Sequence, residues 1–230
     1  MLVLAIDTSS AAVTAAVADV SGTDVVLRAE RITVNARGHG EQLAPNIDGC
    51  LHEAAGAPGE LDAIVAGVGP GPFTGLRVGL VTAAVMGDVL GIPTYGVCSL
   101  DAIAGRYQLA GGGGSSRPDD PERPFLVATD ARRKEVYWAR YLGGVRVEGP
   151  EVSRPDDVPP GSHAMTGAGA RLYSDVLGLP LFDQLYPDAA ALVRCAAERI
   201  RAAAPSEALS PLYLRRPDAV PPSTAKPVSQ

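Results

Sequence analysis

The sequence predicts a duplicated α/β fold, and two observations carry that prediction. Aliphatic strand-like runs alternate with helical segments through short connections, which is typical of α/β layers with mainly parallel strands. A strand, an Asp at the bend and a returning strand occur once in each half of the chain, at Asp7 and at Asp130. This repeat favours two α/β units with a cleft between them. A chance recurrence of so short a pattern is the alternative.

The elements of the first half follow from short aliphatic runs and the turns between them. We expect strands at 2–6, 12–18, 25–34 and 63–66, and a helix that opens at 39–45. The apolar residues of this helix fall at helical spacing and make one face, formed by Leu43, Ile47, Cys50, Leu51 and Ala54. A face of this kind usually covers a sheet.

A loop of Gly and Pro, GVGPGPF, follows the strand at 63–66 and opens onto a long apolar helix. We expect Thr74 to be the N-cap of this helix and Gly91, followed by Pro93, to end it. Small residues recur at every fourth position and share one helix face: Gly75, Gly79, Ala83 and Gly87. This stripe predicts close approach of another segment, either within one domain or from another protein chain.

The two predicted lobes are separated by a Gly-rich segment. A strand at 94–98 and a helix from Ser99 complete an N-terminal lobe at 1–110, and residues 111–124 read as a flexible linker. The C-terminal lobe spans 125–205. Its expected elements are a strand that starts at 125 and leads into the bend at 130–131, a returning strand at 135–141, a Gly-rich turn at 166–170 leading into a helix, and an amphipathic helix at 187–203. Residues 206–230 form a tail whose Pro-rich end is expected to be disordered.

Composition and charge exclude several classes of protein. The net charge of −6 argues against strong unaided binding to nucleic acid, although the run Arg132-Arg133-Lys134 is a local candidate for contact with phosphate or RNA. The cysteines Cys50, Cys98 and Cys195 show no paired spacing. No signal peptide is evident, and the long apolar helix is short for a membrane span and carries charges. We expect a cytoplasmic protein with no membrane partner.

The two Asp-bearing bends are the candidates for ligand contact. Hydroxyls and backbone N–H groups in a turn such as Asp7-Thr8-Ser9 can wrap a phosphate, and Asp130 and Gly167 occupy related turns in the second half. A plain hairpin whose Asp caps its own turn is the alternative. No metal or catalytic residue is expected, because His39 and His52 have no mate at ligand spacing and no P-loop or nucleophile-elbow motif is present.

Six segments in the same order resemble the bacterial TsaB family, also called YeaZ: IDTSS at 6–10, HGEQLAP at 39–45, GVGPGPFTGLRVGL at 67–80, GVCSLDAIA at 96–104, DARRKEVYWARY at 130–141 and PLYLR at 211–215. The resemblance implies a two-lobed actin/Hsp70-like (ASKHA) fold with duplicated mixed sheets flanked by helices. It also implies a non-catalytic role in forming N6-threonylcarbamoyladenosine at position 37 of tRNAs that read ANN codons.

The resemblance also implies partners. It implies the catalytic subunit TsaD, the ATPase TsaE, a homodimer when the chain is alone, and tRNA reached through the complex. ATP and Mg²⁺ would be used by the complex, with no cofactor bound by this chain alone. The implied subunit interface lies on the helices at 40–55 and 74–90, with the residues Leu43, Ile47, Leu51, Gly75, Leu76, Gly79, Leu80, Ala83 and Gly87.

The chain departs from the family pattern at three positions. Gly40 and Pro72 stand where Ser is usual, and Met86 stands where Lys is frequent, which argues against a polar contact from that helix turn. Two further functions are weighed against the partner-subunit role. An ATP-dependent phosphotransferase of the same superfamily would use the Asp7 and Asp130 hairpins. A peptidase, suggested by older names in the superfamily, would need a metal pair or nucleophile set.

Overall fold

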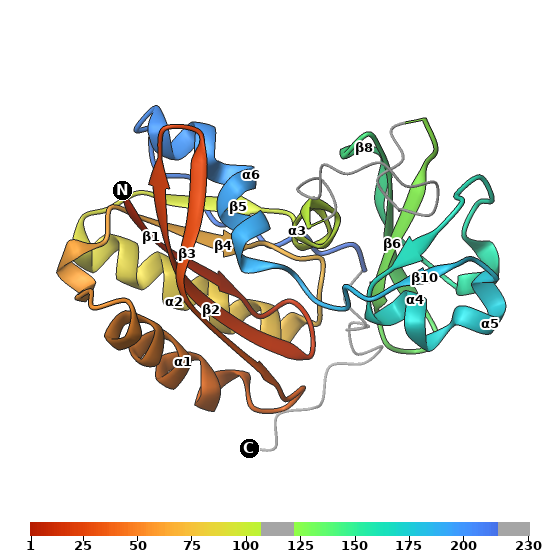
Figure 1. Cartoon of the computed structure of the whole chain (residues 1–230). Helices are drawn as coiled ribbons and strands as arrows, with labels where there is room; N and C mark the ends of the chain where they lie inside the picture. The colour runs from red at the N-terminus through yellow and green to blue at the C-terminus, as the bar shows by residue number, and fades with distance from the viewer. Residues whose placement is uncertain (107–121, 216–230) are drawn as a thin grey trace, which may run out of the picture.

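The computed structural model describes residues 1–106 and 122–215, which form two lobes (Figure 1). The first lobe is built mainly from the N-terminal part of the chain, and the second from residues after 122. Most of the expected linker at 111–124 and the expected disordered end of the tail lie outside the described residues.

A five-stranded mixed sheet with the order β3-β2-β1-β4-β5 forms the first lobe. Its strands are β1 (Leu2–Asp7), β2 (Ala12–Ser21), β3 (Asp24–Val34), β4 (Ala63–Gly67) and β5 (Thr94–Val97). The first three strands pair antiparallel as a meander, whereas β4 pairs parallel with β1 and β5 pairs parallel with β4. Buried Ala and Val on both faces make β1 and β2 almost fully covered, as a sheet between two helical layers requires.

The second sheet repeats this pattern in the order β10-β9-β6-β7-β8. Its strands are β6 (Phe125–Asp130), β7 (Val136–Leu142), β8 (Val145–Ser153), β9 (Met165–Thr166) and β10 (Leu181–Phe182). Again three strands form an antiparallel meander and two add in parallel beside the first. Asp7 and Asp130 each end the first strand of their sheet. The predicted duplication of mixed sheets is therefore confirmed.

Helices cover both faces of the first sheet. Helices α1 (His39–Glu53) and α2 (Phe73–Leu90) pack on one face, and α6 (Ala189–Arg201) packs on the other (Figure 1). The sequence predicted a C-terminal lobe that spans 125–205. In the structure, α6 of that range packs instead on the first sheet, through Leu192, Ala196 and Ile200. The shorter helices are α3 (Ser99–Gly105), α4 (Ala168–Leu172) and α5 (Ser174–Leu177), with single 3-10 turns at Pro58–Glu60 and Pro155–Asp157.

Helix α3 joins the two lobes. Ala102 lies in the core that α6 shares with the first sheet, and Leu100 and Ile103 lie in the core beneath β6 and β7. A Cβ added to Gly105 would stand 3.0 Å from Ala191 Cβ, so α3 and α6 are in close contact. Tyr141 of β7 donates a hydrogen bond of 2.7 Å to the Asp101 carboxylate, which fastens α3 to the second sheet.

Of the two predicted ends of α2, the C-terminal end is confirmed and the N-cap is wrong. Gly91 adopts a left-handed backbone with φ of 66° and ends the helix, as predicted. The N-cap is Pro72 and not Thr74, and no side chain caps the first turn. Pro93 follows and leads directly into β5.

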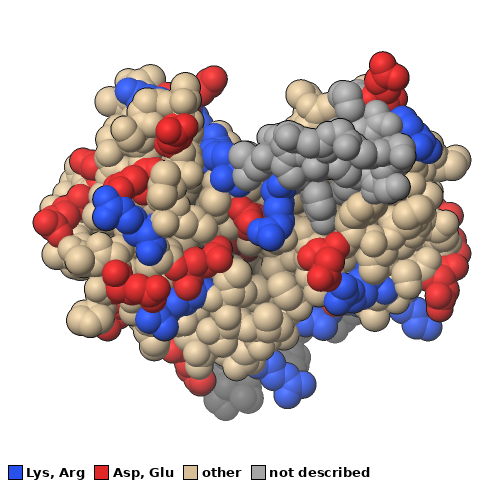
Figure 2. Space-filling model, in the orientation of Figure 1, with Lys and Arg blue, Asp and Glu red and all other residues tan. Residues whose placement is uncertain are grey.

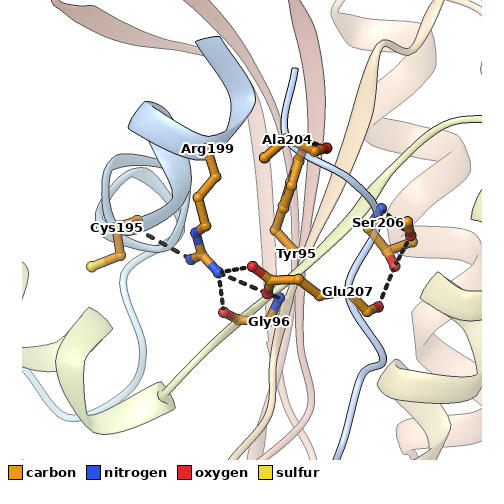
Figure 3. Close-up of polar contacts among 8 residues, drawn as sticks. Tyr95, Gly96, Cys195, Arg199, Ala204, Ser206 and Glu207 are labelled. Atoms are coloured by element: carbon orange, nitrogen blue, oxygen red, sulfur yellow. Dashed lines mark hydrogen bonds and ion pairs between the residues drawn. The ribbon is translucent and has the colours of Figure 1, made fainter. Parts of the chain in front are cut away.

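Beyond α6 the chain runs back along the edge strand β5 as a strap, which we define as residues 204–213. The backbone N–H of Glu207 donates to the Thr94 carbonyl at 2.8 Å, and the N–H of Leu212 donates to the Val68 carbonyl at 2.8 Å. Figure 3 shows the Glu207 carboxylate held by the Arg199 guanidinium and by the N–H of Gly96. The strap thus satisfies backbone groups that an open sheet edge would expose.

Candidate functional site

A pocket of about 610 Å³ lies between the lobes and is lined by two of the five predicted ligand residues. The first lobe contributes the turn after β1 and the beginnings of α1 and α2, and the second lobe contributes the end of β6, the bend that follows it and helix α4. Ser9 and Asp130 line the pocket, whereas Asp7, Thr8 and Gly167 do not. The two Asp-bearing bends therefore face one cleft but contribute unequally to it.

Asp7 is a buried structural group. Its carboxylate accepts hydrogen bonds from the Ser99 hydroxyl at 2.6 Å, from the Ser9 backbone N–H at 2.9 Å and from the Ser9 hydroxyl at 2.8 Å. Desolvation by burial raises the pKa of Asp7, and the hydrogen bonds from Ser99 and Ser9 partly oppose that shift. A Cβ added at Gly67 would stand only 1.7 Å from its Oδ2, so the carboxylate is enclosed by backbone. The interpretation of Asp7 as the cap of its own turn is the one that the geometry supports.

Thr8 is inserted against the backbone of α2. Its hydroxyl donates to the Gly75 carbonyl at 2.8 Å and accepts from the Gly79 N–H at 3.0 Å. A Cβ at Gly79 would stand 2.5 Å from Thr8 Oγ1. The glycines therefore leave the space that lets the turn after β1 bond to two successive helix turns.

The second bend is more open. Asp130 accepts a hydrogen bond of 2.8 Å from the Arg132 N–H, and the Arg132 guanidinium lies 3.3 Å from its other oxygen. The residues Arg132, Arg133 and Lys134 all adopt left-handed backbone angles, with φ of 62°, 54° and 63°. Non-glycine residues in this conformation cost about 1 kcal/mol or more each, so this basic bend is strained.

The glycines of the turn before α4 are needed for close backbone packing. Gly167 has a φ of 105°, and a Cβ there would stand 2.2 Å from the Ala128 carbonyl oxygen. Its neighbour Gly169 lies against the backbone of Thr129 in the same way. The turn thus fixes the place of α4 on β6, and Gly167 itself does not reach the pocket.

His39 is held by a backbone group. Its Nε2 lies 2.7 Å from the Ser10 carbonyl oxygen, and the ring packs beside Gly75 at the start of α2. Among the described residues no group of three or more His, Cys, Asp and Glu side chains is placed to hold a metal ion. His39 therefore joins the turn after β1 to α1 and α2.

The residues predicted at the subunit interface are buried within the protomer. All nine are buried against the first sheet or its neighbouring turns: Leu43, Ile47, Leu51, Gly75, Leu76, Gly79, Leu80, Ala83 and Gly87. The physical reason is that Thr8 of the turn after β1, together with Ile6 and Thr94 of the sheet, fills the space left by the small-residue stripe. Of the two explanations for the stripe, close packing within one domain is the one observed.

The opposite face of α2 is apolar and uncovered. We define the α2 outer strip as Phe73, Val81, Val85 and Val89, whose exposed fractions are 56, 59, 56 and 76%. This helix is the one described helix that is long and apolar enough to cross a membrane by length and composition, and a third of that window is buried in the protomer. The three Val residues recur at every fourth position, so the sequence carried a signal for this strip.

An aromatic and cationic cluster extends the outer strip at its N-terminal end. Phe73 stacks on Tyr213 of the strap with ring centroids 5.3 Å apart, and the Arg77 guanidinium lies 3.9 Å above the Phe73 ring. The Arg77 Nε also donates to the Tyr213 hydroxyl at 2.8 Å. Exposed aromatic and Arg side chains of this kind are frequent anchors in protein interfaces. No sequence pattern predicts this cluster, because 136 residues separate Arg77 from Tyr213.

The charged side chains give no extended basic surface on the face drawn in Figure 2. Acidic and basic groups are interspersed there over both lobes. This distribution fits a net charge of −6, and it gives no electrostatic footprint for unaided nucleic-acid binding on that face.

The comparisons with known proteins agree with this architecture. A family model described as TsaD, tRNA N6-adenosine threonylcarbamoyltransferase, matches residues 31–167. An uncharacterized protein of Mycobacterium tuberculosis is 48% identical over 219 residues, which are 95% of this chain and 94% of that protein. A Mycobacterium leprae relative is 51% identical over 225 residues, 96% of this chain, but the chain spans only 56% of that relative's length.

Some of the matches carry a more specific name. The tRNA threonylcarbamoyladenosine biosynthesis protein TsaB of Bacillus subtilis is 34% identical over 143 residues, 61% of this chain and 55% of that protein. The solved structure of YeaZ from Pseudomonas aeruginosa superposes with a TM-score of 0.71 and 26% identity, covering 92% of this chain and 100% of that one.

The repeated mixed sheets with a cleft between them define a two-lobed protein of the actin/Hsp70-like (ASKHA) class. The chain belongs to the family of the matched tRNA N6-adenosine threonylcarbamoyltransferase model, within its TsaB (YeaZ) branch. The resemblance stated from the six sequence segments is thereby confirmed.

Proposed function

We propose that this chain is a non-catalytic partner subunit in the biosynthesis of N6-threonylcarbamoyladenosine in tRNA, and that it binds a catalytic subunit of the TsaD type. The observation that carries the proposal is the uncovered α2 outer strip on a member of the TsaB family. Full burial of one Val or Phe side chain is worth about 1.5–3 kcal/mol, so covering the strip is strongly favourable.

The same surface accounts for the expected homodimer. In the absence of the catalytic subunit, the outer strip of one copy pairs with that of a second copy. An ATPase of the TsaE type, tRNA and Mg²⁺–ATP then act in the assembled complex, in the cytoplasm and away from membranes. In this proposal the outer strip forms the subunit interface, in place of the buried residues that the family resemblance implied.

The geometry gives no support to the alternative of a stand-alone phosphotransferase. A Mg²⁺–ATP site at the first bend would need the Asp7 carboxylate in the cleft. That carboxylate is buried and accepts three hydrogen bonds from Ser9 and Ser99. Breaking these bonds to coordinate a cation would leave buried donors unpaired.

Genetic rescue tests the function. Depletion of the protein in its host should remove N6-threonylcarbamoyladenosine from tRNA, as measured by mass spectrometry of digested tRNA. Expression of this chain should restore the modified nucleoside. Unchanged levels of the nucleoside after depletion would refute the proposed role.

Substitutions on the outer strip test the interface. We expect Val85→Glu to abolish co-purification with the catalytic subunit and to reduce self-association in light scattering, since it places a carboxylate among apolar side chains. Val26→Glu on β3 is the matched control, because Val26 and Val85 are 57% and 56% exposed. Both variants should fold like the wild type by circular dichroism. Undiminished co-purification of Val85→Glu would show that the interface lies elsewhere.

A further inference from the structure

The bend between β6 and β7 presents three consecutive cations to solvent. Arg132, Arg133 and Lys134 are all exposed, whereas the flanking residues Ala131 and Val136 are buried. The outer surface of this basic bend is therefore formed by charged side chains. In this it differs from the apolar outer strip of α2, so the two surfaces suit partners of different chemistry.

The backbone of the basic bend is unfavourable for the residues that occupy it. All three have positive φ, a conformation that Gly adopts freely and that a residue with a side chain adopts at a cost. The corresponding turn of the first lobe, residues 8–11, is described throughout and has no residue with positive φ. Because the three side chains are exposed, burial in the protomer does not explain why long cations stand where glycines would fit.

Arginines already match the carboxylates beside the bend. Asp130 lies 3.3 Å from the Arg132 guanidinium, and Glu135 pairs with Arg215, which follows the strap. The bend and its ion pairs thus contain four cations against two carboxylates, in a chain whose net charge is −6. A local excess of positive charge of this kind attracts an anionic partner.

Arg37 continues the positive region onto the first lobe. Arg37 and Arg132 line the same pocket from opposite lobes. Cations spread over both lobes suit an extended polyanion with repeated charges better than a single small anion. Guanidinium groups pair with phosphate oxygens through two parallel hydrogen bonds, which favours a phosphate backbone.

We propose that the basic bend contacts the phosphate backbone of RNA, through Arg133 and Lys134 with Arg132 and Arg37 beside them. This inference rests on the proposed function, in which the RNA is a tRNA bound by the assembled complex. Phosphate contacts fix the orientation of a nucleic acid and carry no sequence information. The bend therefore adds affinity and orients the tRNA, and it does not select the nucleotide that is modified.

Fluorescence anisotropy with a labelled, unmodified tRNA transcript tests the contact at about 50 mM salt. The full chain is measured alone and together with the catalytic subunit. We expect the double variant Arg133→Gln/Lys134→Gln to bind about tenfold more weakly and to lower the slope of log affinity against log salt by about 1.5.

The matched control is Arg28→Gln/Arg31→Gln on β3. It changes the net charge by the same amount, and its two side chains are 53% and 45% exposed. This control should keep the wild-type affinity for tRNA within about twofold, since both arginines lie outside the bend. An equal loss of affinity in both double variants would show an effect of net charge alone and would overturn the inference.

Two substitutions of Lys134 separate an RNA contact from a structural role. Lys134→Gln removes the charge and keeps the unfavourable backbone, whereas Lys134→Gly removes both. Both variants should lose tRNA affinity equally, and Lys134→Gly should melt at the higher temperature. Undiminished tRNA affinity of either variant, or a lower melting temperature of Lys134→Gly than of Lys134→Gln, would overturn the inference.

The same measurements distinguish this inference from the partner-subunit role. If the chain does not bind the catalytic subunit, the anisotropy of the full chain alone still decides whether the bend contacts RNA. If Arg133→Gln/Lys134→Gln loses the catalytic subunit but keeps its own affinity for tRNA, the bend contacts an acidic protein surface and the RNA assignment fails. The assignment also fails if the tRNA binds neither the chain nor the complex.

Discussion

Replacing Gly79 with Ala tests whether the small-residue stripe of α2 serves the fold of the protomer. The new methyl carbon would stand 2.5 Å from Thr8 Oγ1, 3.3 Å from Thr8 Cγ2 and 3.4 Å from Ile6 Cγ2. Overpacking of this kind costs about 1–3 kcal/mol, and displacement of Thr8 also loses a hydrogen bond worth about 1 kcal/mol. The better helix propensity of Ala returns about 1 kcal/mol. We therefore expect a net destabilisation of about 1–3 kcal/mol.

A double-mutant cycle isolates the contact with Thr8. In a Thr8→Ala background the two nearest atoms are gone, and Ile6 Cγ2 at 3.4 Å is the nearest that remains. There Gly79→Ala should be neutral or stabilising by up to about 1 kcal/mol, through helix propensity alone. The expected coupling energy is about 2 kcal/mol, well above the error of additivity. Urea unfolding followed by circular dichroism gives all four stabilities.

A matched control lies on the neighbouring helix. A Cβ at Gly40 in α1 would meet nothing within 4 Å, so Gly40→Ala should stabilise the protein slightly or leave it unchanged. If Gly79→Ala lowers the free energy of unfolding equally in the wild type and in the Thr8→Ala background, the packing explanation is refuted. A Gly79→Ala variant that keeps full stability but no longer binds its partner would show that the stripe forms part of the subunit interface.

Two further predictions concern buried polar groups of the first lobe. Asp7→Ala should cost about 2–3 kcal/mol, since it leaves donors of Ser9 and Ser99 unpaired, whereas Asp7→Asn should cost less. Because burial raises the pKa of Asp7 above its usual 3.8, its contribution to stability is full below that value and is lost as pH rises through the folded-state pKa. The free energy of unfolding of Asp7→Asn, relative to that of the wild type, should therefore be higher at pH 7 than at pH 3. An equal difference between the two proteins at both pH values would refute this. Glu207→Ala should release the strap and speed amide exchange at Leu212, whereas unchanged exchange would show that the strap holds without this carboxylate.

The strands around the two Asp-bearing bends were predictable because their signals are local. Continuous aliphatic runs ending at Asp7 and Asp130 identify the first strand of each sheet. Strands β9 and β10 have two residues each, too few to show any periodicity. The return of α6 to the first sheet was not predictable, since an amphipathic face indicates that a core is covered but not which one.

The site was predictable only in part, because its contacts span long stretches of sequence. The spacing of Gly75 and Gly79 correctly indicated close approach of another segment. The segment that approaches is Thr8, which is 71 residues from Gly79, and no pattern within α2 identifies it. Spacing also placed Val81, Val85 and Val89 on one face, but both faces of α2 are apolar, and only burial shows which of them is free.

The two copies of the duplicated turn have different physical roles. In the first lobe, Asp7 accepts hydrogen bonds from its neighbours and Thr8 bonds to the backbone of α2, so the polar groups of that turn hold the helix that carries the outer strip. In the second lobe, the buried Thr129 hydroxyl has no hydrogen-bond partner among the described residues, and Arg132, which pairs with Asp130, lines the pocket. The first turn is closed by its own hydrogen bonds, whereas the basic bend of the second lobe lies at the cleft. The first turn therefore supports docking through α2, whereas the second presents Arg132 to the cleft.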